Sequence, residues 1–267
     1  MAVTLPLFED FAREVGKDNI EVFPLVPAGA DPHTYSLSAA DLARLKDADF
    51  VFLNGGGLDT AMQDAIEASL SENAHVIPFT PNIRSPQGGG LTAEQAGDNP
   101  HLWLDPALAS VYAEIIADEL SIYDGVHQQY YSDNLAAYKQ RLNALASGIN
   151  TRLQAVPAGR RRLVTLHDSF PHLARRFDLK VSGFLVETSA DAVAEANVTR
   201  LAAVIAEQEV PAVFTEYGFD AGAPGNLAAQ TGVPLCTLVS DISPPDATTY
   251  EQVMTRNSDE LVRCLGG

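Results

Sequence analysis

The sequence predicts an α/β protein built from parallel β-α-β units. Short runs of β-branched and other apolar residues alternate with amphipathic segments of helical period from about residue 20 to the end of the 267-residue chain. Strand, helix and strand at this spacing are typical of parallel sheets covered by helices on both faces. Hydrophobic residues make up 46% of the chain, close to the globular average of about 45–50%, so a packed core is available.

The expected elements alternate along the chain. Each predicted strand is a short apolar run, and each predicted helix is a longer stretch with one apolar face. Strands are expected at residues 20–26, 50–53, 76–79, 163–166, 181–186, 212–215 and 235–239. Helices are expected between them at residues 39–46, 58–70, 107–122, 198–207 and 250–265.

One segment near mid-chain departs from this rhythm. Residues 128–156 contain no Pro and a single Gly, Gly148, and their apolar residues recur at steps of three or four. A helix of this length spans about 42 Å, far more than a crossover helix needs. We therefore predict a rigid strut between two lobes: an N-terminal β-α lobe over residues 1–126, the linking helix over 127–156 and a C-terminal β-α lobe over 157–267.

Charge and hydropathy restrict the class of partner. The 35 acidic and 17 basic side chains give a formal net charge of −18, so no nucleic acid is expected, because proteins that bind it cluster Lys and Arg against phosphates. No run of about 18–20 apolar residues is present, so no transmembrane helix is expected. The N-terminus lacks the basic flank and apolar run of a signal peptide, which leaves the compartment open.

Three histidines occupy similar places in the predicted fold. His33 follows a predicted strand, His101 opens a predicted helix, and His167 ends a predicted strand. In α/β sheets, ligand sites form at the carboxyl ends of strands, where such loops gather. Asp241 follows the last predicted strand, and Glu216 is a rival for the same role. Each residue alone is more often structural, but three imidazoles and one carboxylate together suit a divalent transition metal.

The two cysteines, Cys236 and Cys264, both lie near the C-terminus and do not form a C-x-x-C pair. Two buried free thiols are one interpretation. A local disulfide that ties a C-terminal helix to a strand is the other, and it would indicate an oxidising compartment.

Three motifs together are similar to those of a known family. The segments are LVPAGADPHTY at residues 25–35, NPHLWLDP at 99–106 and TLHD at 165–168, and residues 48–55 add to them. On these motifs the chain resembles the ZnuA/TroA-like (cluster A-I) solute-binding proteins, which are zinc and manganese receptors of ABC transporters. The resemblance implies two (β/α) lobes joined by one rigid helix, with the metal in the cleft between them. The implied ligands are His33, His101, His167 and Asp241.

The resemblance also implies a function and its partners. It implies a monomeric receptor, and not an enzyme, that delivers its ion to the membrane permease of an ABC importer, with a metallochaperone as a further candidate partner. The expected location is the periplasm, or the cell envelope if the protein is a lipoprotein. A disulfide occurs in the second lobe of some family members, which favours a Cys236–Cys264 bond. Residues 80–98 lack the His-rich loop of many zinc receptors, so no metal-gathering role is expected there.

Zinc is the expected cargo, with Mn²⁺ as the alternative. Imidazole suits Zn²⁺, and sites with nitrogen and oxygen ligands bind Zn²⁺ more tightly than Mn²⁺. Four protein ligands are expected to close the site, whereas a catalytic zinc keeps a position open for water. Other acids near the motifs are candidates for orienting the imidazoles: Asp31, Asp105, Asp168 and Glu216.

Two further alternatives stay open. One is a receptor for a metal chelate such as haem or a siderophore, which predicts a wide aromatic cleft and ligands more than about 5 Å apart. The other is a zinc hydrolase with Glu216 as its base. The absence of an H-E-x-x-H motif argues against the hydrolase.

Overall fold

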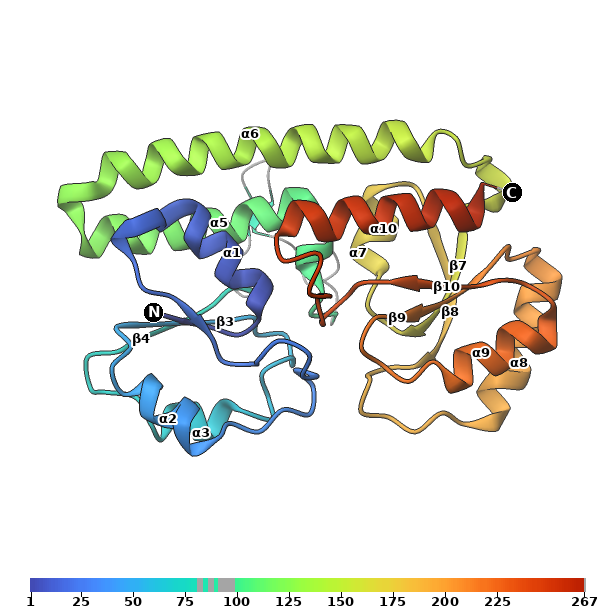
Figure 1. The fold of residues 1–267 in the computed structure, drawn as a ribbon, viewed down its shortest axis with the longest axis horizontal. Helices are drawn as coiled ribbons and strands as arrows, with labels where there is room; N and C mark the ends of the chain where they lie inside the picture. The colour runs from blue at the N-terminus through green and yellow to red at the C-terminus, as the bar shows by residue number, and fades with distance from the viewer. Residues whose placement is uncertain (81–83, 86–88, 91–98, 267) are drawn as a thin grey trace.

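The protein consists of two α/β lobes bridged by one long helix (Figure 1). In the computed structural model, residues 1–80, 84–85, 89–90 and 99–266 are described. The first lobe contains a parallel sheet with strand order β2-β1-β3-β4, and the second contains a parallel sheet with order β10-β9-β7-β8. The predicted fold class is confirmed.

The first lobe is built from four short strands and the helices around them. Its strands are β1 (Ala2–Val3), β2 (Phe23–Pro24), β3 (Phe50–Leu53) and β4 (His75–Pro78). Its helices include α1 (Pro6–Gly16), α2 (Ala39–Leu45), α3 (Gln63–Glu67) and α5 (Pro106–Tyr123). Its core contains an aromatic cluster, in which Phe8 packs against Phe79, Trp103 and Tyr112 with ring centroids 5.2–5.6 Å apart.

Several elements of this lobe differ from the sequence prediction. The apolar run at 20–26 forms only the two-residue strand β2, which pairs with the edge of β1. The helix expected at 58–70 is restricted to α3, and the chain before it turns at Gly55, Gly56 and Gly57, all with positive φ. Helix α1 and strand β1 lie before the region in which the alternation is visible.

The long helix α6 (Gln128–Leu153) crosses both lobes, as Figure 1 shows. It packs against α5 and against the C-terminal helix α10 (Tyr250–Leu265). The predicted apolar stripe faces these helices, since Tyr138, Leu142 and Ile149 are buried. The linking helix is therefore present, whereas the lobe limits at residues 126 and 157 stay predictions.

The second lobe is more regular. Its strands are β7 (Arg162–His167), β8 (Lys180–Val186), β9 (Val213–Glu216) and β10 (Leu235–Leu238). Its helices are α7 (Pro171–Arg176), α8 (Glu195–Gln208), α9 (Gly222–Thr231) and α10. Helices α7 and α9 were not expected from the sequence. Strand β10 lies at the edge of this sheet, with α10 packed against it.

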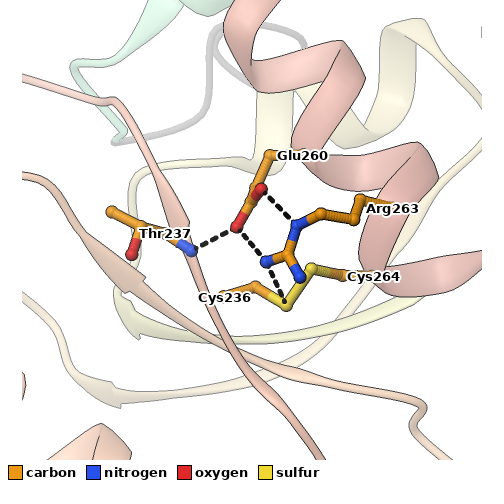
Figure 2. The surroundings of a disulfide bond; sticks show 5 residues. All are labelled: Cys236, Thr237, Glu260, Arg263 and Cys264. Atoms are coloured by element: carbon orange, nitrogen blue, oxygen red, sulfur yellow. Dashed lines mark hydrogen bonds and ion pairs between the residues drawn. A yellow bond between two sulfur atoms is a disulfide. The ribbon is translucent and has the colours of Figure 1, made fainter.

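A disulfide ties α10 to the edge strand. Figure 2 shows the bond between Cys236 in β10 and Cys264 in α10. One turn earlier on the same helix, the Glu260 carboxylate accepts a hydrogen bond from the Thr237 backbone N–H at 3.0 Å. The disulfide prediction is confirmed, and the free-thiol interpretation is wrong.

Two other sequence predictions concern helices and the 80–98 loop. Within the described ranges, no helix combines the length and apolar character that crossing a membrane requires. Of the segment 80–98, the two-residue strands β5 (Arg84–Ser85) and β6 (Gly89–Gly90) are described, and they pair antiparallel. The question of an accessory role for that segment lies mainly outside the described residues.

Candidate metal centre

Side chains from separate loops meet where the two lobes face each other. Each offers one nitrogen or oxygen atom, and these atoms all lie within 4.8 Å of one another. The group contains the residues singled out from the sequence, hereafter the candidate ligands: His33, His101, His167 and Asp241.

The topology of the two sheets explains why these residues meet. His33 lies in the loop after β2, and His101 directly precedes a short 3-10 helix, η3 (Leu102–Leu104). His167 is the last residue of β7, and Asp241 lies just beyond β10. The carboxyl ends of parallel strands gather at one edge of a sheet, so each lobe supplies two candidate ligands along its inner edge.

The ligand atoms are spaced as a small metal ion requires. His101 Nε2 lies 3.2 Å from His167 Nε2. Asp241 Oδ1 lies 3.2 Å from His101 Nε2, and Asp241 Oδ2 lies 3.2 Å from His167 Nε2 and 3.7 Å from His33 Nε2. Ligands bound about 2.0–2.1 Å from a tetrahedral zinc ion lie about 3.3–3.4 Å apart. The observed spacing therefore fits such an ion.

Two of the imidazoles are held so that Nε2 faces the centre. His101 Nδ1 lies 2.9 Å from Asn99 Oδ1, and His167 Nδ1 lies 2.9 Å from Glu216 Oε1. Both partners are oxygen acceptors, so each Nδ1 carries a hydrogen, and Nε2 is the ring nitrogen that can bind a metal once any proton on it is displaced. The second oxygen of Glu216 accepts from Ser169 Oγ at 2.9 Å, which fixes the carboxylate.

His33 and Asp241 contribute buried atoms that make no hydrogen bond. Among the described residues, neither His33 Nε2 nor Asp241 Oδ1 has a hydrogen-bond partner. The His33 side chain is 8% exposed and the Asp241 side chain is fully buried. Unpaired buried polar atoms cost about 1–3 kcal/mol each, and a cation at the centre would satisfy both of these.

A comparison with known families identifies the protein class. The profile described as "ZnuA: Zinc-uptake complex component A periplasmic" matches residues 1–264. The chain belongs to the ZnuA family. Members are substrate-binding receptors of ABC transporters, so this chain is a receptor and not an enzyme, and the hydrolase alternative is wrong.

Individual relatives of this ZnuA-family chain can be aligned with it over nearly its full length. The zinc-binding protein TroA of Treponema pallidum is 27% identical over 99% of this chain and 88% of its own length. The manganese-binding lipoprotein MntA of Halalkalibacterium halodurans is 24% identical over 99% of this chain and 88% of its own. The solved structure of the Treponema TroA covers 100% of this chain and 98% of its own, with a TM-score of 0.89 and 26% identity.

The electrostatics of the centre place charges on particular residues. Burial alone raises the pKa of Asp241, but the imidazoles of His101 and His167 outweigh it and hold that pKa well below its usual range. Burial lowers the pKa of His101, more than Asp241 raises it. Burial acts on His167 in the same direction, yet Glu216 and Asp241 together raise the pKa of His167 to about 10. A charged His167 thus faces a neutral His101 and an ionised Asp241.

The acids expected to orient imidazoles have different roles in the structure. Of these four, Glu216 alone reaches an imidazole of the described candidate ligands. Asp105 caps α5 through the Ala107 backbone N–H, and Asp31 accepts from the backbone N–H of His33. Asp168 accepts from Asn99, which itself orients His101 and was missed in the sequence. The sequence feature that indicates this role of Asn99 is an amide side chain two positions before a candidate ligand.

The space beside the centre is small. A cavity of about 210 Å³ adjoins Asp241, between the loop at Gly29 and the loop at Ser243. Pockets for drug-sized ligands usually enclose about 300–1,000 Å³. With candidate ligand atoms within 4.8 Å of one another, the geometry favours a bare ion over a metal chelate.

Proposed function

We propose that this ZnuA-family receptor binds one zinc ion between its lobes and delivers it to the permease of an ABC importer. The zinc ligands in this proposal are the Nε2 atoms of three imidazoles and one carboxylate, from His33, His101, His167 and Asp241. We further propose that the protein works as a monomer in the periplasm or as an envelope lipoprotein. Relatives named as lipoproteins, such as FimA of Streptococcus parasanguinis, support the envelope location.

One observation carries the proposal. The ligand atoms of both lobes converge on a single point, while the opposite ring nitrogens of His101 and His167 are already hydrogen-bonded to Asn99 and Glu216. Such oxygen partners fix the tautomer of a metal-ligating imidazole and increase its basicity. A purely structural cluster of histidines has no need to leave buried atoms of His33 and Asp241 unpaired.

The donor set favours zinc over manganese. Three imidazoles and one carboxylate suit Zn²⁺, whereas Mn²⁺ prefers carboxylate, carbonyl and water oxygens. Relatives named for zinc and for manganese are similar to this chain to nearly the same degree. The choice of zinc therefore rests on the donor set, because the names of the relatives favour neither metal.

Uptake and release follow from the division of the ligands between the lobes. The first lobe supplies His33 and His101, and the second supplies His167 and Asp241. Separation of the lobes leaves the ion with two protein ligands, which weakens its binding and frees it for transfer to the permease. While the lobes are together, the imidazoles around Asp241 hold its pKa well below its usual range, so this carboxylate is ionised when it faces the ion.

Metal titration of the purified protein tests the proposal. Calorimetry with a competing chelator should give tight binding of one Zn²⁺ per chain and weaker binding of Mn²⁺. Replacement of both His101 and His167 by Ala should abolish tight zinc binding. His127→Ala is the matched control, because His127 is an exposed histidine paired with Asp124. This variant should bind zinc as tightly as the unaltered protein. Unchanged zinc affinity in the double variant would overturn the proposal, and tighter binding of Mn²⁺ would overturn the choice of metal.

A further inference from the structure

The two candidate ligands of the first lobe occur in the same short motif. Asp31-Pro32-His33 and Asn99-Pro100-His101 both place an acid or its amide two residues before the histidine. In each motif a side-chain oxygen accepts a hydrogen bond from the histidine backbone N–H, at 3.0 Å for His33 and 3.1 Å for His101. The central Pro restricts the residue before it to extended backbone, which favours this turn.

The other polar atom of each motif reaches the second lobe. Asp31 Oδ2 accepts a hydrogen bond from Ser189 Oγ at 2.8 Å. Asn99 Nδ2 donates to Asp168 Oδ2 at 3.1 Å and also to the Asp168 backbone carbonyl. Ser189 lies in the loop after β8 and Asp168 in the loop after β7, so both partners belong to the second lobe. In each motif, the side chain of Asp31 or Asn99 therefore binds the histidine backbone through one polar atom and the second lobe through the other.

We propose that Asp31 and Asn99 are positioning residues that couple closure of the lobes to the placement of His33 and His101, and that their bonds to Ser189 and Asp168 set how long the metal is retained. This inference rests on the proposed function. Opening the lobes breaks both cross-lobe bonds and leaves each histidine turn without its second anchor. The metal then loses His33 and His101 for two reasons: the lobes move apart, and the two histidine turns become less firmly held.

The Ser189 bond is the more influential of the two for release. His33 lacks a hydrogen-bond partner for Nε2 among the described residues, whereas the ring of His101 is held by Asn99 Oδ1. The His33 side chain is also more exposed than that of His101, 8% against 2%. His33 is therefore the candidate ligand whose position depends most on its loop, and that loop is tied to the second lobe through Ser189.

Two variants break the cross-lobe bonds without touching the histidine turns. Ser189→Ala removes the donor to Asp31 and leaves the Asp31 bond to the His33 backbone in place. Asp168→Ala removes one of the two acceptors for Asn99, so its effect should be smaller. Thr188→Val is the matched control, because it removes a hydroxyl from the same loop that bonds Asp191 within that loop.

The rate of zinc release into excess chelator, followed by stopped flow, tests the inference. Loss of one net hydrogen bond should speed release about three- to tenfold in Ser189→Ala and less in Asp168→Ala. Thr188→Val should release zinc at the rate of the unaltered protein. In the zinc-loaded Ser189→Ala variant, amide hydrogen exchange should also rise in residues 27–35. The melting temperature of the metal-free protein should stay unchanged in all three variants.

Each contrary result has a distinct meaning. If the unaltered protein binds no zinc, the proposed function and the inference fall together. If it binds zinc but Ser189→Ala releases it no faster than Thr188→Val, the coupling is refuted while the proposed function stands. A lowered melting temperature of Ser189→Ala with an unchanged release rate would show that the bond is merely structural, and this also overturns the inference.

Discussion

Replacement of Asn257 by Leu should destabilise the second lobe and weaken metal binding in the same variant. Asn257 lies on the buried face of α10 and is 1% exposed. Its Oδ1 accepts from the Val239 backbone N–H and its Nδ2 donates to the Val239 carbonyl, both at 2.8 Å. Val239 directly follows the edge strand β10, so this amide pairs backbone groups that a further strand would otherwise pair.

The magnitude follows from the two backbone groups that leucine leaves unpaired. A buried backbone group without a partner costs about 1–3 kcal/mol, so the two groups together cost about 2–6 kcal/mol, and the free energy of unfolding should fall by about 3 kcal/mol. Leucine has the same branched shape and the same number of side-chain heavy atoms as asparagine, so the loss does not come from a cavity. For a protein of this size, a loss of that order lowers the melting temperature by about 6–12 °C. Asp241 lies two residues beyond Val239, so zinc affinity should fall as well.

Urea unfolding of the metal-free protein and zinc titration measure the two effects. Asp259→Ala on the same helix is the control, because Asp259 is 63% exposed and its ion pair with Arg152 is a surface contact. Such pairs contribute about 0–1 kcal/mol. If the leucine variant were as stable as this control, the stabilising role assigned to the bonds between Asn257 and Val239 would be refuted.

Further predictions concern proton release, stability against pH and the partner of His167. Zinc must displace the proton of His167, whose pKa is raised to about 10 by Glu216 and Asp241 against the effect of burial. Calorimetry at pH 7 in buffers of different ionisation enthalpy should therefore show about one proton released from this ring, and zinc affinity should fall as the pH is lowered. Burial raises the pKa of Asp10 to about 6, so the folded state binds this proton more tightly than the unfolded state does. This proton contributes up to about 3 kcal/mol to the free energy of unfolding; the contribution is present below about pH 4 and is lost as the pH rises through about 6. Urea unfolding of Asp10→Asn should not show this pH dependence. Glu216→Gln keeps an acceptor for His167 but removes the charge, so zinc affinity should fall about 10–100-fold in titration.

Each of these predictions has a contrary outcome. Zinc binding without buffer-dependent heat would show that His167 is neutral before the metal arrives. An identical pH dependence of stability in the unaltered protein and Asp10→Asn would show that Asp10 does not titrate in this range. Full zinc affinity in Glu216→Gln would show that the hydrogen bond from His167 suffices without the negative charge.

Much of the fold could be predicted because its signals are local. The periodicity of residues 128–156 predicts the linking helix, since an apolar stripe at steps of three or four must face a single partner surface. The apolar runs at 50–53 and 163–166 coincide with β3 and most of β7. Helix α9 was missed: its sequence, GAPGNLAAQT, contains two Gly and one Pro, and its helical form depends on packing against β9.

The candidate site was likewise predictable in part from the sequence. The loop positions of His33, His101 and His167 follow from strand ends that are visible in the sequence. The choice between Asp241 and Glu216 was open there, and the structure brings Asp241 to the three Nε2 atoms and Glu216 to the Nδ1 atom of His167. That distinction depends on which sheet position each strand occupies, and neighbours in a sheet are set by long-range pairing.

By itself, the sequence determined the α/β class, the two lobes with a connecting helix and the residue types that suit a divalent metal. These properties depend on the local period of apolar residues and on the chemistry of individual side chains. Only the tertiary structure decided the partners that come from distant parts of the chain: Glu216 for His167, and Ser189 for the loop of His33. The physical reason is that each hydrogen bond to Glu216 or Ser189 joins segments far apart in the chain, and a directional contact of this kind leaves no periodic trace in the sequence.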